Sequence, residues 1–318
     1  QAPRTDPVAH TVNGRDPAGN PPDGTGTLPV LSLPSETAWD ARFHLVPPES
    51  LLEALPREAR RLRELGAGLV EFPGDLCGMG GDYASPGFWS RVSEVLAREG
   101  LGATVHLPFG WVDLAALDGE VWEGSVRSVE RAMAALTPLS PLMASVHPAN
   151  YPTRAVLGMA PGKARPGLHA AFGERIVEAL TRLARGALGP VLALENLEGV
   201  PPELFAAILD AAGVKACLDV GHAVADGQDP CRLFELLEGK VLGLHLHDAA
   251  PPTGRTDAEG LTHERAHRAL GEGRLDLENL VSAVLARDFS GPVVLEVLGD
   301  QEPSVRLWSD TLRTARTG

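Results

Sequence analysis

Histidine and carboxylate residues lie at the ends of short apolar segments at six places along the chain. The segments are TVH, SVH, LALE, CLD, LHLH and VLE. Imidazole combined with carboxylate favours Zn²⁺, Mn²⁺, Fe²⁺ or Co²⁺ over Ca²⁺ or Mg²⁺. The pattern therefore predicts a divalent metal site, provided that the fold brings the segments together. The residues of metal-binding type within them are His106, His147, Glu195, Asp219, His245 and Glu296.

The two glutamates are the strongest members of this set. Glu195 follows LAL and Glu296 follows VVL, so each carboxylate should be buried with its strand. A buried carboxylate without a partner costs several kcal/mol, and a divalent cation supplies that partner. A single histidine at such a place is more often a hydrogen-bonded core residue. His247, which alternates with His245, should face the opposite side of its strand.

With two further histidines, the candidate ligands outnumber those that a single metal ion binds. His222 follows Asp219 in LDVGH, and His267 begins HRALGEG. One ion takes about four protein ligands, so the surplus predicts two or three ions per chain, Zn²⁺ or Mn²⁺. Multinuclear sites serve mainly phosphoryl chemistry, because they clamp the attacking and leaving oxygens. We expect metal-assisted phosphodiester hydrolysis, and the residues expected to act in catalysis are Glu195, Glu296, His222 and His267.

The elements that must position these residues alternate between apolar segments and segments of helical period. The predicted strands cover 40–46, 67–72, 102–107, 142–147, 190–195, 214–219, 241–247 and 292–297. The predicted helices cover 49–64, 86–99, 122–137, 170–186, 202–212, 229–238, 276–287 and 303–315. Eight strands, each followed by a helix, predict an α/β fold, a (β/α)₈ TIM barrel, with a doubly wound open sheet as the alternative. In a barrel the carboxyl ends of all strands meet on one face.

The first 38 residues differ from the rest, since they hold seven proline and four glycine residues and show no apolar periodicity. We expect an irregular N-terminal arm over 1–38, disordered or packed on a neighbouring subunit of a homo-oligomer. No linker divides the remainder. Residues 39–318 therefore form one predicted catalytic domain.

Charge and composition limit the classes of molecule that this chain is expected to bind. The chain has 28 Lys+Arg against 42 Asp+Glu, a net charge of −14. This balance argues against binding to nucleic acid or to an anionic membrane surface, and no apolar run approaches the roughly 18 residues of a membrane span. Three cysteines suit a reducing compartment, which predicts a cytoplasmic location. We expect a small-molecule substrate.

At these residues the chain resembles a known superfamily. HLPF, HPAN, LEN, LDVGH, HLHD, H-x-x-LGEG and LEV occur in this order in endonuclease IV and the xylose-isomerase-like sugar isomerases and epimerases. One position departs from the endonuclease-IV-like pattern, because Arg265 stands where an aspartate ligand is expected. The resemblance implies a TIM barrel whose ligands are His106, His147, Glu195, Asp219, His222, His245, His267 and Glu296. In the sugar epimerases it implies a single metal held by Glu195, Asp219, His245 and Glu296.

A closer resemblance lies in RSVERAMAALTPLSPLMASVH, ENLEGVPPELF and CLDVGHAVADGQDP. These segments are similar to cobamide-remodelling phosphodiesterases, which implies that the substrate is the nucleotide loop of a cobamide. We expect Arg265 and Arg268 to contact its phosphate. Trp111, in a glycine-rich loop, suits a large organic ligand.

The main alternative is a sugar or sugar-phosphate isomerase or epimerase with one metal ion, in which carboxylates move a proton at the carbon next to a carbonyl. His106 and His147 favour the hydrolase, because the single-metal reaction does not require them. An abasic-site endonuclease shares the ligands, but the predicted loops of this chain are not basic, as binding to DNA would require. A metal-binding scaffold without activity is the last alternative, and the intact carboxylates count against it.

Overall fold

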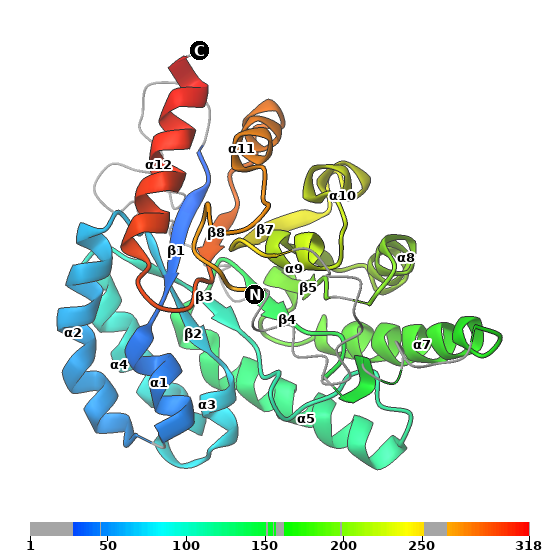
Figure 1. Ribbon diagram of the computed structural model, residues 1–318. Coiled ribbons are helices and arrows are strands. Elements are labelled where there is room, and N and C mark those ends of the chain that lie inside the picture. The colour runs from blue at the N-terminus through cyan, green and yellow to red at the C-terminus, as the bar shows by residue number, and fades with distance from the viewer. Residues whose placement is uncertain are drawn as a thin grey trace, which may run out of the picture.

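Eight parallel strands close into a barrel at the centre of the molecule (Figure 1). The computed structural model describes residues 28–44, 46–150, 152–154, 156, 162–197, 199–250 and 266–317. Each strand pairs with the next, and the eighth pairs with the first, so the predicted (β/α)₈ barrel is confirmed. The strands are β1 Val30–Pro34, β2 Leu69–Pro73, β3 Gly102–His106, β4 Ala144–Val146, β5 Leu192–Glu195, β6 Lys215–Asp219, β7 Val241–Leu246 and β8 Pro292–Leu295.

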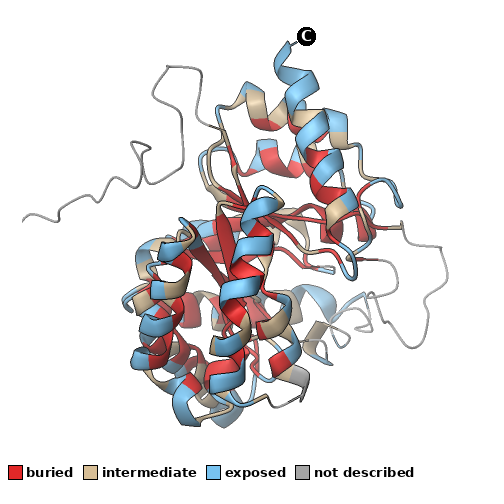
Figure 2. Ribbon diagram, turned by 90° about the vertical axis from the view of Figure 1, so that its left-hand side faces the viewer, coloured by how far each residue is buried: buried red, intermediate tan, exposed pale blue. Residues whose placement is uncertain are grey.

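Helices surround this barrel and turn their buried faces toward it (Figure 2). Several begin at a side-chain cap, as in α5, where Asp118 accepts hydrogen bonds from the backbone N–H groups of Glu120 and Val121. Among the described residues no helix is long and apolar enough to cross a membrane. The helices are α1 Glu36–His44, α2 Pro48–Glu64, α3 Asp75–Gly78, α4 Pro86–Arg98, α5 Gly119–Leu136, α7 Arg165–Leu183, α8 Pro202–Ala212, α9 Val220–Ala225, α10 Pro230–Leu236, α11 Leu277–Ala286 and α12 Glu302–Thr317.

The first strand is not where the sequence pattern predicts it. Residues 40–44 belong to helix α1, which buries Ala38 and Ala41 on one face, so a strand over 40–46 is wrong. The strand that closes the barrel is β1, between β8 and β2. It was missed because VLSLP is short and lies among prolines, whereas alternating residues in DARFHLV imitate a strand. The barrel therefore begins at Val30, and the arm boundary at residue 38 is wrong; residues 1–27 lie outside the described residues.

Removal of β1 should abolish cooperative folding. A chain that begins at residue 39 lacks the strand that hydrogen-bonds to both β2 and β8, together with the buried side chains of Leu31 and Leu33. Its loss leaves two open sheet edges where the barrel was closed. We expect a broad, non-cooperative thermal transition by circular dichroism for this chain. The matched control begins at residue 28 and keeps β1; the two chains unfolding at the same temperature would show that β1 contributes nothing.

Two apolar regions lie on either side of the barrel wall. The main core fills the space between strands and helices. A small separate cluster of Met143, Ala193, Cys217 and Val294 is also fully buried. Gly243 borders it, because a Cβ atom at this position would come within 2.4 Å of the Met143 sulfur. This packing supports the strand ends that carry the site.

Candidate metal centre

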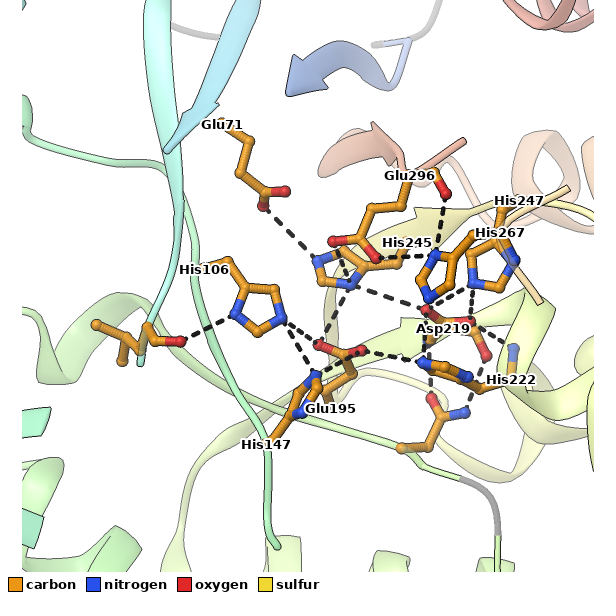
Figure 3. Close-up of polar contacts among 12 residues, drawn as sticks. Glu71, His106, His147, Glu195, Asp219, His222, His245, His247, His267 and Glu296 are labelled. Atoms are coloured by element: carbon orange, nitrogen blue, oxygen red, sulfur yellow. Dashed lines mark hydrogen bonds and ion pairs between the residues drawn. The ribbon is translucent and has the colours of Figure 1, made fainter. Parts of the chain in front are cut away.

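The barrel brings the six strand-end residues to one face, as the sequence predicts (Figure 3). The closed parallel barrel explains this, since the carboxyl ends of all its strands meet on one face. The places of the six are the end of β3 for His106, just past β4 for His147, the end of β5 for Glu195, the end of β6 for Asp219, within β7 for His245 and just past β8 for Glu296.

Glu195 is the centre of the arrangement. Its Oε2 lies 3.4 Å from His106 Nε2 and 3.2 Å from His245 Nδ1, and its Oε1 lies 3.4 Å from His147 Nε2. The Nε2 atoms of His106 and His147 are 3.2 Å apart. Three imidazoles thus meet one carboxylate.

A second set of contacts extends from His245. Its Nδ1 lies 3.3 Å from Glu296 Oε1 and 3.9 Å from Asp219 Oδ2. Glu195, Asp219, His245 and Glu296 each offer a ligand atom, and these atoms lie within 4.8 Å of one another. The same holds for His106, Glu195 and His245. Glu195 and His245 belong to both groups; a carboxylate with two oxygens, such as Glu195, can be shared by two ions, whereas Nδ1 of His245 binds one.

Unsatisfied buried atoms show that these residues fit a cation. Both carboxylate oxygens of Glu195, both ring nitrogens of His245 and Oε1 of Glu296 are buried and accept or donate no hydrogen bond within the described residues. Such atoms carry the full cost of lost hydration unless something else pairs with them. A divalent ion among nitrogen and carboxylate donors removes that cost.

The electrostatic coupling within the cluster is strong. Burial raises the pKa of Glu195, but the positive charge of His245 and the contacts with the His106 and His147 rings outweigh it and hold that pKa well below the usual range. Burial also opposes the charge of His106, yet contact with Glu195 raises the pKa of this imidazole to about 9. For His147, burial dominates and lowers the pKa to about 4. Glu195 is therefore ionised at neutral pH, and His147 is a neutral imidazole able to bind a metal ion.

His222 and His267 lie beside this cluster, at its edge. Asp219 caps helix α9 by accepting the backbone N–H of His222 at 2.6 Å, so the spacing of the two residues places both side chains together. Burial and the neighbouring charge of His247 lower the pKa of His267 to about 3. The His222, His247 and His267 ring nitrogens form a third group within 4.8 Å.

His247 faces Asp219 and not away from it. Its Nε2 lies 3.1 Å from Asp219 Oδ2, and its Nδ1 accepts the backbone N–H of His267 at 2.9 Å. The expectation was wrong because side chains two residues apart in a strand point to the same side, so His247 follows His245. Both ring nitrogens of His247 are thus engaged, so this ring holds Asp219 in place.

Of the residues expected to contact substrate, Arg268 and Trp111 do not line the cavity. Arg265 lies outside the described residues. Arg268 is exposed, and its backbone pairs with that of Asp248. Trp111 is 92% exposed and does not line the cavity. Exposed loop residues follow no periodic pattern, so their direction could not be deduced from the sequence.

Other side chains line a cavity of about 1060 Å³ above the cluster. The Arg42 guanidinium lies 4.7 Å from the Trp39 ring centroid and 4.8 Å from that of Phe109, and it forms an ion pair with Asp75 at 3.2 Å. Gln301 lines the cavity from the loop between β8 and α12. Neither Trp39 nor Arg42 is among the predicted site residues, because the sequence pattern does not predict helix α1, which carries both.

Comparison with known proteins agrees with this geometry. A model of the xylose isomerase-like TIM barrel family matches residues 59–317. The chain belongs to that family. Enzymes of the xylose isomerase-like family generally use divalent metals, which the ligand groups of this chain suit. The number and identity of the ions stay predictions.

Solved structures share the fold of this family member over nearly its whole length. L-ribulose 3-epimerase is 18% identical, with a TM-score of 0.69 over 91% of this chain and 96% of that chain. The 3-keto-D-glucoside 4-epimerase of E. coli is 15% identical, with a TM-score of 0.62 over 91% and 100%. A Thermus thermophilus protein soaked with ZnCl₂ is 25% identical, with a TM-score of 0.57 over 89% and 98%. No curated protein matches the chain in sequence. The resemblance to cobamide-remodelling phosphodiesterases is not supported by these comparisons.

Proposed function

We propose that this chain is a divalent-metal-dependent isomerase or epimerase that acts on a sugar. The observation that carries the proposal is the group of Glu195, Asp219, His245 and Glu296, whose ligand atoms lie within 4.8 Å of one another. Glu195, Glu296 and His222 also line the cavity, so the group opens to a substrate. Two of the similar structures are sugar epimerases, which supports the same reaction class.

The two glutamates are placed to move a proton. A bound divalent cation would polarise a substrate carbonyl and make the hydrogen on the adjacent carbon more acidic. Glu195 is ionised and lines the cavity, so its carboxylate is available to accept a proton. Glu296 reaches the cavity from the opposite side of His245 (Figure 3). One carboxylate removes the proton and the other returns it on the opposite face, which inverts the carbon.

The wall of the cavity suits a neutral, hydroxyl-bearing ligand. Trp39 Nε1 is a buried donor and Gln301 Oε1 a buried acceptor, and neither has a hydrogen-bond partner among the described residues. A hydroxyl group both accepts and donates, so hydroxyls satisfy either kind of atom. The aromatic faces of Trp39 and Phe109 add apolar contact area. A sugar presents both features at once.

Replacement of Trp39 by Phe should weaken substrate binding without removing the metal. The variant keeps an aromatic ring but loses the Nε1 donor, which contributes about 0.5–1.5 kcal/mol when paired. We expect KM to rise roughly threefold to tenfold, with kcat close to that of the wild type. Trp89→Phe is the control, since Trp89 Nε1 donates to the Tyr83 carbonyl away from the cavity. Equal KM values for wild type and Trp39→Phe would remove the indole donor from substrate binding.

Phosphodiester hydrolysis is the second candidate, and one observation favours it. The imidazoles of His106 and His147 meet at 3.2 Å and both face Glu195 at 3.4 Å. A single-metal isomerase does not need them as ligands. Two ions sharing Glu195 would allow the chain to bind both the attacking and the leaving oxygen of a phosphodiester.

One assay separates the two functions. The protein loaded with Mn²⁺, Co²⁺ or Zn²⁺ is incubated in D₂O with ketoses such as L-ribulose and D-tagatose, and in parallel with bis(p-nitrophenyl) phosphate. The isomerase or epimerase incorporates solvent deuterium at the carbon next to the carbonyl and releases no nitrophenol. Release of nitrophenol without deuterium incorporation would replace the proposal with the hydrolase.

A further inference from the structure

Glu71 is a buried carboxyl group that neither candidate reaction uses. It is the third residue of β2, it has no solvent-exposed surface, and it lies inside the barrel. Neither of its carboxylate oxygens has a hydrogen-bond partner among the described residues. Burial raises the pKa of Glu71 to about 8. A buried carboxyl group without a hydrogen-bond partner destabilises the fold, so its presence calls for a functional reason.

The nearest polar atom belongs to a metal ligand. Glu71 Oε1 lies 3.8 Å from His245 Nε2, on the side of the ring away from the cluster (Figure 3). The other nitrogen, Nδ1, faces Glu195 at 3.2 Å and Glu296 at 3.3 Å. The imidazole thus lies between Glu71 and the metal-binding carboxylates.

We propose that Glu71 is a positioning residue of the metal centre, which accepts the Nε2 proton of His245 and keeps Nδ1 turned toward the cation. This inference rests on the metal site of the proposed function and not on its reaction. An imidazole that binds a metal through Nδ1 carries its remaining proton on Nε2. Histidine ligands almost always donate this proton to a carboxylate or carbonyl, which fixes the ring and strengthens the ligand.

Other groups near the ring do not fill this role. The Cys217 thiol faces His245, and the sulfur of a thiol is only a weak acceptor. Ser32 and Thr104, on the strands that flank β2, hydrogen-bond to each other at 2.8 Å. The three ligand groups found among the described residues do not include Glu71. The role that remains for Glu71 is to accept the hydrogen bond from His245 Nε2.

The distance fits a contact that tightens. A separation of 3.8 Å lies just beyond hydrogen-bond distance. A movement of less than about 1 Å brings the two atoms to hydrogen-bond distance. The carboxyl group offers an acceptor oxygen whether it is protonated or ionised.

Metal affinity tests the proposal without any substrate. The Zn²⁺ dissociation constant is measured by competition with a chromophoric chelator for the wild type, Glu71→Met and Glu71→Gln. Methionine keeps the length of the side chain and removes the acceptor, so we expect Zn²⁺ to bind about 10- to 100-fold more weakly. Glutamine keeps an acceptor oxygen and should restore most of the affinity. His245 belongs to both groups of ligand atoms around Glu195, so the loss of affinity is expected whichever group holds the Zn²⁺ ion.

Glu58→Met is the matched control. Glu58 is also a buried glutamate, but it lies on α2 and bonds Ser35 and Thr37, away from the ligands. It should lower the thermal unfolding temperature and leave Zn²⁺ affinity within about twofold. Equal affinity of Glu71→Met and the wild type would overturn the proposal, as would an equal loss in Glu71→Met and Glu71→Gln.

A measurement on the wild type needs no substitution. The ¹⁵N NMR spectrum of the Zn²⁺-loaded protein reports which nitrogen of His245 carries the proton. We expect the proton on Nε2, and a proton on Nδ1 would overturn the proposal even if the variants fail to fold. Absence of isomerase activity affects neither measurement, so failure of the proposed function is recognised separately.

Discussion

Glu195→Gln should lower both the bound metal and the turnover of this protein by at least about 10- to 100-fold. Glutamine keeps the shape of the side chain and removes the negative charge. That charge meets His106, His147 and His245 within 3.4 Å, and Glu195 belongs to both groups of ligand atoms around it. No other side chain of the cluster contacts as many candidate ligands among the described residues, so its loss affects every ion bound there.

The measurement is metal content per chain by elemental analysis, with turnover assayed on the same samples. Glu58→Gln serves as a control, because it removes a buried carboxylate of similar length outside the cluster. Its metal content should equal that of the wild type. Unchanged metal content and turnover in Glu195→Gln would place Glu195 outside the site and leave the proposed function without its base.

The ligand set could be predicted from the sequence because strand ends and metal-binding residue types coincide. All strands after the first lie where apolar segments predict them, and the closed barrel then requires their carboxyl ends to meet. His147 and Glu296 lie just past their strands and still reach the cluster, so the result does not depend on exact strand ends.

Residues that act from unexpected elements could not be predicted. Glu71 lies in LVEFP, where a single carboxylate among apolar residues is the signal that could have revealed it. That signal does not say which side of the strand faces the barrel interior, and β2 is buried along its whole length. Trp39 and Gln301 line the cavity through their tertiary positions, on α1 and on the loop before α12. Their roles depend on distances that a linear pattern does not contain.

The double change His106→Ala, His147→Ala separates the two candidate functions by the largest margin. In an isomerase or epimerase, Glu195, Asp219, His245 and Glu296 keep their ion, so we expect the same metal content before and after the change and turnover within about tenfold. In a hydrolase the same change removes the ligands of a second ion. Bound metal then falls by one equivalent, and phosphodiester cleavage falls by at least about 100-fold.

The control for the loss of imidazoles is His169→Ala on helix α7, outside the ligand groups. It should change neither metal content nor turnover. The pKa of His147 is lowered to about 4 by burial, whereas that of His106 is raised to about 9 by contact with Glu195, so the wild type and the variant are compared at the same pH. The number of bound ions is measured without substrate. It therefore shows whether Glu195 binds two ions or only one. A wild type that binds two ions per chain and loses one in the double variant would favour the hydrolase over the function proposed above.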